Sequence, residues 1–399
     1  MTNLSVGVTT KIVSSGNKPI ESVGASTAAF LGLSVKGPVN KAVLITSWAS
    51  YLKTFSGFAE APYLAHAVYG FFQNGGGRCY VVNVGPPKEG QSVQEIAALI
   101  TGEDKGPALR TGIQTLNNIP DVSLVAAPGM IAPEIQEILK THCSALQDRM
   151  AILDGIEDLG GKGLDEMPRP GGFPDGAIYF PWLQVFDPEK KQNVFVPPSG
   201  HVCGMIARTD HDRGVHKPPA NEPLHGVIGL KYDLTREEQN VLNPRGINCI
   251  RNFGDGGIKV YGARTLSADP EWKYLNVRRL FQVVRSSLQK GTEWVVFEPN
   301  NPTLWGDIRR NARARGRRPR APRRSAAGSP ASCRGCNAPR DSPAAPRSRG
   351  RSPPAPRRAG LSRAARRRGC NAPRRGPGAA PARGRSSPPP RRSASARAA

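Results

Sequence analysis

The chain has 399 residues, enough for two or three domains, and its formal net charge of +25 would by itself suggest a nucleic-acid-binding protein. Residues 311–399 contain 25 arginines, no lysine and one acidic residue, out of 56 basic and 31 acidic residues in the whole chain. Residues 1–310 therefore hold 31 basic and 30 acidic residues and are nearly neutral. No apolar run approaches the roughly 20 residues of a membrane-spanning helix, and the first eight residues lack the features of a signal peptide.

The first 22 residues are polar and β-branched. Val6, Val8, Thr10 and Ile12 recur at every second position, which places them on one face of an extended strand. No adjacent segment offers this strand a partner, so the strand is expected to lie alone in its own part of the chain.

Residues 42–153 alternate between strand and helix patterns. Ser92 and Glu95 have the spacing of a capping box, in which each side chain bonds the backbone of the other residue. A strand, a helix and a strand within about 35 residues indicate a parallel α/β sheet. The expected strands are 42–45, which should be buried, 79–84, 122–126 and 150–153, and the expected helices are 61–72, 92–100 and 133–146.

The next region is richer in turns. Residues 160–175 are rich in glycine and proline and predict a surface loop. A helix is expected from Ser199 to about residue 207, followed by a polar loop. Thr235 and Glu238 form a second capping box, for a helix through residue 242. Strands are expected at 249–253 and 258–261.

A long helix is predicted after residue 268. Asp269 is placed to cap it, with Pro270 in its first position. Apolar side chains at helical spacing predict a buried stripe, with Lys273, Arg278, Arg279 and Arg285 lying largely off it. The stripe consists of Val277, Leu280, Phe281, Val284 and Leu288. A strand at 293–297 and a helix from residue 301 through residue 308 should follow.

Residues 311–399 change character abruptly. They contain no aromatic or β-branched residue, so they cannot bury enough apolar surface to offset an ordering cost of about 1–2 kcal/mol per residue. The segment is therefore expected to be disordered. Its residue types have codons rich in G and C, and it begins inside a predicted helix, which favours a frameshift product. The alternative is a natural Arg-rich tail that binds nucleic acid.

The run NGGGR at 74–78 has the composition of a phosphate loop. A phosphate loop needs a strand, then glycines, then a helix N-terminus directed at the anion. The predicted order here is helix, glycines and strand. The run is better explained as the end of a helix.

Residues 197–225 hold the densest set of reactive or metal-binding side chain types. Their HxC and DHD spacings do not match a zinc site. Ser199, His201 and Asp210 supply the types of a catalytic triad, but residues two apart on a helix point to different faces. CxxC at 333–336 lies in the tail without a second pair, and the seven scattered cysteines are typical of reduced thiols in a cytosol. No catalytic residue, metal or cofactor is expected.

Longer blocks carry a resemblance to a known family. The chain resembles contractile phage tail sheath proteins, most closely the short sheaths of phage-like particles and injection systems. The matching blocks are 7–32, 76–85, YFPWLQVFDP at 179–188, VPPSGHVCGMIARTD at 196–210, RGVHKPPAN at 213–221, LNPRGINCIRNF at 242–253, GIKVYGARTLS at 257–267 and 272–305. Within them the family signature is Pro197, Pro198, Ser199, Gly200, Arg213, Gly214, Asn221, Gly246, Ile247, Asn248, Gly262, Ala263, Arg264 and Thr265.

The resemblance implies a structural subunit and not an enzyme. Sheath subunits stack as six-membered rings around an inner tube, and contraction of the sleeve drives the tube through a membrane. Their α/β core is subtilisin-like without protease activity. Each subunit lends terminal arm strands to neighbours, and Val6, Val8, Thr10 and Ile12 would belong to the N-terminal arm. The implied partners are other sheath subunits, the inner tube protein, and baseplate and tail-terminator proteins, in a particle assembled in the cytoplasm, with no specific nucleic acid and only indirect membrane contact.

The resemblance also divides the chain. Residues 1–22 would form the N-terminal arm, 23–268 the α/β core, 269–310 an incomplete α+β C-terminal domain, and 311–399 the disordered tail. Two features depart from the family. Thr9, Thr10 and Lys11 stand where the arm usually carries acidic residues, and the tail replaces the family's last helix, strand and C-terminal arm. This copy is therefore expected to be defective in assembly.

Overall fold

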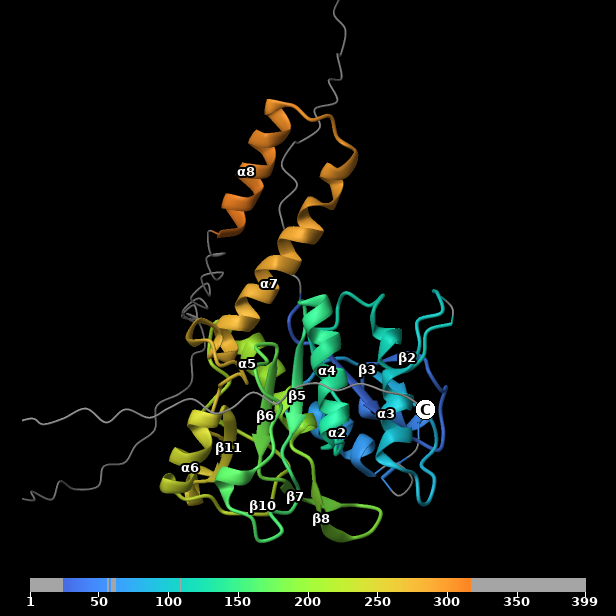
Figure 1. Cartoon of the computed structure of the whole chain (residues 1–399), viewed down its shortest axis with the longest axis vertical. Coiled ribbons are helices and arrows are strands. Elements are labelled where there is room, and N and C mark those ends of the chain that lie inside the picture. The colour runs from blue at the N-terminus through green and yellow to red at the C-terminus, as the bar shows by residue number, and fades with distance from the viewer. Residues whose placement is uncertain (1–23, 56, 59–61, 108, 317–399) are drawn as a thin grey trace, which may run out of the picture. The chain divides into compact units, whose positions relative to one another are not determined.

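The computed structural model describes residues 24–55, 57–58, 62–107 and 109–316 (Figure 1). The strand expected within residues 1–22, with Val6, Val8, Thr10 and Ile12, lies outside the described residues, as does the segment 317–399. The described part covers the expected α/β core and the region that follows Asp269.

A nine-stranded mixed sheet forms the centre of the fold (Figure 1). The strands β3, β1, β4, β5, β6 and β11 run parallel to one another, whereas β2, β12 and β9 pair antiparallel at the two edges. Parallel strands require crossover connections, so this is the α/β fold that the sequence predicts. In spatial order the strands are β2 (Ala42–Ile45), β3 (Cys79–Asn83), β1 (Ala28–Gly32), β4 (Leu124–Ala126), β5 (Met150–Asp154), β6 (Gly176–Phe180), β11 (Ile247–Asn252), β12 (Ile258–Val260) and β9 (Glu222–Pro223).

Helices cover both faces of this sheet. Side chains alternate along β1, so Phe30 belongs to one buried apolar cluster and Leu31 to the other. Helices α2 and α5 pack together on the Phe30 side, and α3 and α4 pack together on the Leu31 side. The helices are α1 (Trp48–Thr54), α2 (Pro62–Gln73), α3 (Val93–Thr101), α4 (Pro133–Leu146), α5 (Ser199–Arg213), α6 (Arg236–Leu242), α7 (Leu275–Thr292) and α8 (Pro302–Gly316).

A second, antiparallel sheet has the strand order β10 (Gly229–Leu230), β7 (Leu183–Asp187), β8 (Gln192–Val196). A cis peptide bond joins Phe180 to Pro181 between β6 and β7. Short 3₁₀ turns complete the described part: η1 (Gly112–Leu116), η2 (Leu164–Glu166), η3 (Asn243–Arg245), η4 (Gly254–Gly256), η5 (Pro270–Trp272) and η6 (Glu293–Phe297).

Both capping boxes and the glycine stop after α2 are confirmed. Both capping boxes form, with Ser92 and Glu95 at α3 and with Thr235 and Glu238 at α6. Helix α2 ends at Gln73, and Gly75 follows two residues later with φ of 98°. This is a left-handed backbone conformation, which glycine adopts without strain. Because β3 then follows, the order of elements is the reverse of a phosphate loop.

Two predictions in the first 250 residues are wrong in part. The strand 42–45 exists as β2, but it lies at the edge of the sheet and the Leu44 side chain is 44% exposed, because only β3 flanks it. The helix from Ser199 does not end near residue 207 but continues to Arg213. Asp210 therefore lies in the polar last turns of this helix and not in a loop.

The region after residue 268 differs most from prediction. Asp269 caps only the turn η5, through a bond from the Glu271 amide, and the long helix α7 begins later, at Leu275. Residues 293–297 form the turn η6 and not a strand. The last helix continues past residue 310, where the disordered tail was expected to begin, to Gly316.

Candidate assembly surface

The first group of signature residues surrounds the start of α5. The backbone N–H and the hydroxyl of Ser199 donate to the two carboxylate oxygens of Asp154, at 2.7 and 2.8 Å, and the Gly129 amide donates to the same carboxylate at 3.1 Å. Asp154 ends strand β5 and is buried. Burial raises the pKa of Asp154 to about 6, against the lowering effect of these hydrogen bonds. The contacts join β5, α5 and the loop before α4.

These contacts do not form a catalytic triad. The Ser199 hydroxyl donates directly to Asp154, whereas the His201 ring packs against Gly70 on α2. Asp210 lies farther along α5 and binds the guanidinium of Arg279. The three side chains therefore do not converge, and the expected divergence of Ser199 from His201 is seen.

Glycines allow α2 and α5 to approach closely. A Cβ atom added at Gly200 would lie 2.3 Å from the Cα of Ala67 on α2. A Cβ atom added at Gly204 would lie 2.3 Å from the carbonyl oxygen of Phe71. Both distances are too short for carbon, so Gly200 has a packing role at this helix crossing.

The second group of signature residues joins β11 to the loop before α7. The Asn248 side chain donates to the carbonyl oxygens of Ile178 and Arg264, at 3.2 and 2.8 Å, and accepts from the Arg264 amide at 2.7 Å. A Cβ atom added at Gly262 would lie 2.8 Å from the Asn248 side chain oxygen. Asn248 therefore fixes this loop against the middle of β6.

The same loop holds the beginning of α7. The Leu275 amide donates to the Ala263 carbonyl at 3.0 Å, and the Thr265 amide donates to the Lys273 carbonyl at 2.9 Å. The Thr265 hydroxyl donates to the Trp272 carbonyl at 2.6 Å. The segment 262–265 thus determines where the last helical region leaves the sheet.

The remaining signature residues mark turns. Gly214 ends α5 with φ of 89°, Gly246 has φ of 79°, and Asn221 adopts φ of 58° while its amide donates to the Val260 carbonyl. Ile247 is buried at the start of β11, and Arg213 is exposed. Pro197 and Pro198 directly precede α5.

Helix α7 faces the α/β body with polar side chains. Arg278 forms two hydrogen bonds with Asp175, at 2.6 and 3.0 Å. Arg279, only 2% exposed, donates to both carboxylate oxygens of Asp210 and to the Ala25 carbonyl at 2.8 Å. Gln282 donates to the Asp175 carboxylate and to the carbonyl oxygen of Arg149, the residue before β5.

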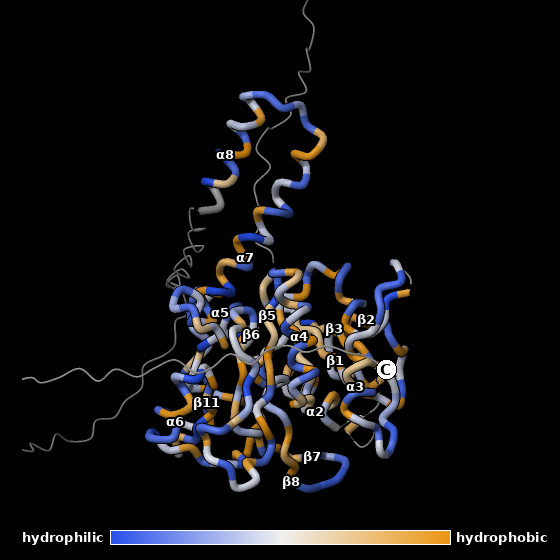
Figure 2. Tube along the Cα trace, in the orientation of Figure 1, coloured by the Kyte–Doolittle hydropathy of each residue, from blue (hydrophilic) through white to orange (hydrophobic). Residues whose placement is uncertain are grey.

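The predicted apolar stripe of α7 is not buried. Exposed fractions are 40% for Leu280, 56% for Phe281 and 38% for Val284, and the interpretation that placed Arg279 off the buried face is wrong. Figure 2 shows apolar segments continuing along α7 and α8, beyond the strands of the sheet. The helical period correctly groups these residues on one face, but the body accepts the opposite, polar face. An exposed apolar face of this kind is typical of a contact surface.

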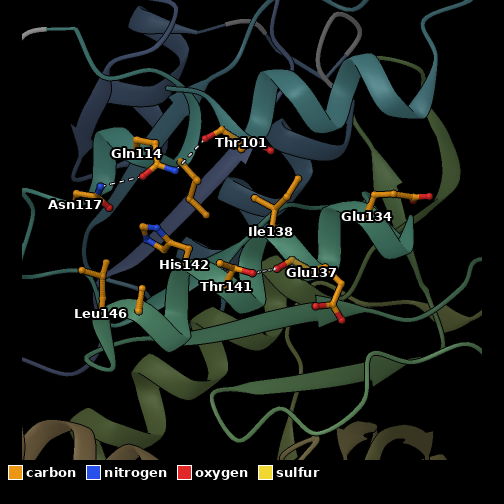
Figure 3. A pocket seen from close by; sticks show the side chains of 11 residues that line it. Thr101, Gln114, Asn117, Glu134, Glu137, Ile138, Thr141, His142 and Leu146 are labelled. Carbon is orange, nitrogen blue, oxygen red and sulfur yellow. Dashed lines mark hydrogen bonds between the residues drawn. The ribbon is translucent and has the colours of Figure 1, made fainter. Parts of the chain in front are cut away.

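A pocket of about 600 Å³ lies between η1 and α4, on the Leu31 side of the sheet (Figure 3). His142 lines it, and its Nε2 accepts a hydrogen bond from the Arg149 guanidinium at 3.3 Å. Burial lowers the pKa of His142 to about 3, with the Arg149 charge acting in the same direction. His142 is therefore neutral. Its neighbours in the pocket include Thr141 and two exposed glutamates, which do not form a nucleophile–base pair.

Comparisons with known proteins show what this chain is similar to. Residues 170–266 match the family model of the phage tail sheath protein central domain, and residues 267–318 match that of the phage tail sheath C-terminal domain. The helical sheath of the anti-feeding prophage in its contracted state is 27% identical, with a TM-score of 0.60, over 78% of this chain and 82% of that chain. The chain is similar to contractile tail sheath proteins over most of its length.

Other sheath proteins are similar over most of their length. A prophage major tail sheath protein of Pseudomonas aeruginosa (strain UCBPP-PA14) is 27% identical over 304 residues, which are 71% of this chain and 74% of that protein. The tail sheath protein of Escherichia phage P2 is 24% identical over 68% of this chain and 70% of its own length. The sheath complex of an extracellular contractile injection system, PVC, is 28% identical with a TM-score of 0.60, over 78% of this chain and 80% of that chain.

Similarity to sheath proteins indicates a structural role for this chain and not an enzymatic one. The family consists of structural proteins and not of enzymes, and the related complexes are helical sheaths and baseplates of contractile particles. None of these comparisons supports the alternative of a nucleic-acid-binding protein. Within the described residues, no group of three metal-ligating side chains occurs and no helix is long and apolar enough to cross a membrane.

Sequence reasoning missed the structural roles of three acidic residues. Asp154 and Asp175 are buried, the Asp210 side chain is 4% exposed, and all three accept the hydrogen bonds that position α5 and α7. Asp154 carries one signal, because an acid directly after a buried strand stands at the carboxyl edge of a parallel sheet. Asp210 was considered only as a possible triad member. Neither Asp175 nor Asp210 carries a local signal for its contact with α7, because their partners lie 103 and 69 residues away.

Proposed function

We propose that this chain is a structural subunit of a contractile tail sheath, which polymerises as hexameric rings around an inner tube and contracts to drive the tube through a membrane. The similarity to the contracted anti-feeding-prophage sheath, over 78% of the chain, is the observation that carries the proposal. The exposed apolar face of α7 supports it, because a subunit of a helical polymer must present surface for its neighbours. The work of contraction would be stored in contacts between subunits.

The chain would be organised in four parts. Residues 1–22 would form an arm given to a neighbour, 23–268 a subtilisin-like core, and the region from 269 to the end of α8 at Gly316 an incomplete C-terminal domain, followed by the Arg-rich tail. The loop 262–265 supports a boundary near residue 268, because it holds the start of α7 through backbone bonds. The proposed partners are other sheath subunits, a tube protein, a baseplate and a tail terminator.

The tail would make this copy unable to assemble alone. Sheath subunits are linked through arms at both termini, and the Arg-rich tail stands where the C-terminal arm would be. Electron microscopy of the purified chain is therefore expected to show no long, regular sleeves. The DNA reading frame near Asp307 provides an independent check, because a frameshift predicts that another frame encodes an apolar helix and a terminal strand.

A chimera tests the proposed function directly. Residues 1–310 are joined to the C-terminal region of the Pseudomonas aeruginosa relative, a tail sheath protein that aligns with this chain over 304 residues. The chimera is expected to form helical sleeves that electron microscopy resolves, and the matched chimera without residues 1–22 is expected to remain unassembled. A folded chimera that stays monomeric at every concentration would count against the sheath function.

A further inference from the structure

The apolar face of α7 needs a cover that the described residues do not provide. Leu280, Phe281 and Val284 share this face, and among the described residues the one ring in contact with Phe281 is that of Trp272, at 5.1 Å between centroids. The next turn and helix add exposed apolar side chains, with Val296 at 72%, Phe297 at 96% and Trp305 at 48% exposure. Water contact with this much apolar surface is unfavourable, so an additional segment is expected to lie on it.

The sequence outside the described residues contains one apolar candidate. Residues 317–399 have a single large aliphatic residue, Leu361, and no aromatic or β-branched residue. By contrast, Leu4, Val6, Val8 and Ile12 stand at even-numbered positions of the N-terminal segment, which places them on one face of an extended strand. Of the two terminal segments outside the described residues, the N-terminal one therefore has the side chains for an apolar cover.

The N-terminal segment enters the described fold beside α7. The guanidinium of Arg279 donates to the carbonyl oxygen of Ala25 at 2.8 Å, and both residues are buried. Val284 lies five residues farther along the helix, which corresponds to about 7.5 Å of helical rise. The twelve residues from Ile12 to Gly24 can span about 40 Å when extended, so residues 4–12 can reach the apolar face of α7.

We infer that, in the free subunit, residues 4–12 pack in cis over the apolar face of α7. This inference rests on the proposed function, because it describes where the arm lies before it is given to a neighbour. Packing in cis would compete with arm exchange and with aggregation through the same face. Assembly would then require release of the arm from its own helix.

Cross-linking with isotope labels tests the inference in the full chain. The three tail cysteines are replaced by serine; the four cysteines of the described residues are buried and can remain. Val8→Cys is combined with Val284→Cys, and unlabelled and ¹⁵N-labelled proteins are mixed before a short bismaleimide is added. The control pair combines Val8→Cys with Asn193→Cys, an exposed position on β8.

The expected result is a cross-link in monomeric protein whose two peptides carry the same isotope, at least tenfold above the control pair. Mixed-isotope peptides would mean that the arm of a second copy occupies the face, and would overturn the inference while leaving the sheath function standing. A yield equal to that of the control would overturn it as well. Failure of the chimera to form sleeves would instead count against the proposed function.

Proteolysis gives a second measurement that needs no cysteine. Trypsin cleaves after Lys11, which lies within the proposed docked segment, whereas Lys18 precedes Pro19 and is not a tryptic site. In the double variant Phe281→Ser, Val284→Ser, cleavage at Lys11 is expected to be several-fold faster than in the wild-type chain. Both side chains are partly exposed, so the body should keep its melting temperature. Equal cleavage rates in the two proteins would contradict docking in cis.

Discussion

Single residues with no side chain control how closely two helices pack in this molecule. Gly200 on α5 faces the backbone of Ala67 on α2, and no flexible side chain separates them. An added methyl group must therefore move a helix and cannot simply rotate a neighbour aside. The α2–α5 pair covers one face of the sheet, so the displacement would reach the buried cluster around Phe30.

We expect Gly200→Ala to reduce the free energy of unfolding by about 1–3 kcal/mol, the usual range for overpacking a core. The control is Gly77→Ala, where an added Cβ atom has no atom within 4 Å and φ is not positive. Urea denaturation of both variants against the wild-type chain provides the measurement. An equal effect at the two positions would show that loss of glycine flexibility, and not the close contact, is responsible.

Asp154 is expected to make stability depend on pH. Burial raises its pKa to about 6 in the folded chain from an ordinary value of 3.8. Between these values the folded chain keeps a proton that the unfolded chain releases, so stability falls as pH rises. A difference of about two pKa units corresponds to about 3 kcal/mol. Above pH 6 the effect is complete and stability no longer changes through this group.

Comparison with Asp154→Asn isolates this effect. The variant lacks the titration, so the wild-type advantage in unfolding free energy should shrink by about 3 kcal/mol between pH 4 and pH 7. Histidines with lowered pKa, such as His142, destabilise both proteins equally in acid and cancel in the difference. Chemical denaturation at several pH values provides the data. A pH-independent difference would show that the carboxyl group titrates normally in the fold.

At the scale of elements, α7 is amphipathic in the opposite sense to a surface helix of an isolated domain. Its polar side chains are buried and bonded, and its apolar side chains are exposed. Arg279 and Asp210 are 2% and 4% exposed, so removing one charge leaves the other buried without its partner. This arrangement attaches the helix firmly while leaving its apolar face available.

We expect Arg279→Met to reduce the free energy of unfolding by about 3–5 kcal/mol, the usual effect of breaking a buried ion pair. Arg285→Met is the matched control, because Arg285 is exposed and bonds only Gln147, so its loss should cost less than about 0.5 kcal/mol. Thermal unfolding followed by circular dichroism compares the two. Similar melting temperatures would mean that the Arg279–Asp210 pair contributes little to holding α7.

Helices and strands were predicted better than the contacts that bury them. Residues 133–146 form the expected helix, because Pro133 at its first position and a regular apolar period agree. Strands β1 and β6 were not predicted individually, since each is a short, fully buried run without alternation. The burial of α7 was predicted on the wrong side, because a helical period groups residues on a face without indicating what covers that face.

The residues of the candidate site could be predicted from the sequence, but the contacts that they make could not. Signature residues such as Asn248 and Gly262 were identified through resemblance, but their role in fixing the loop before α7 depends on contacts between distant segments. Local sequence patterns extend over a few residues and cannot contain this information. The buried acids that complete the arrangement were missed for the same reason.

At the scale of the whole molecule, charge and fold occupy different parts of the sequence. Residues 1–310 contain 31 basic and 30 acidic residues, whereas the 25 arginines of 311–399 face a single acid. A concentrated positive charge binds polyanions by counterion release, independently of any folded site. The folded part should therefore owe neither its stability nor its family function to the tail.

Deletion of residues 317–399 tests this separation while keeping α8 intact. The melting temperature is expected to stay within about 1–2 °C, because surface changes away from packed features usually alter stability by less than about 0.5 kcal/mol. Retention on heparin at 0.15 M salt should be lost, since the remaining chain is close to neutral. A large fall in melting temperature would mean that the Arg-rich segment packs on the fold, and retention without it would reveal a polyanion-binding surface on the α/β body.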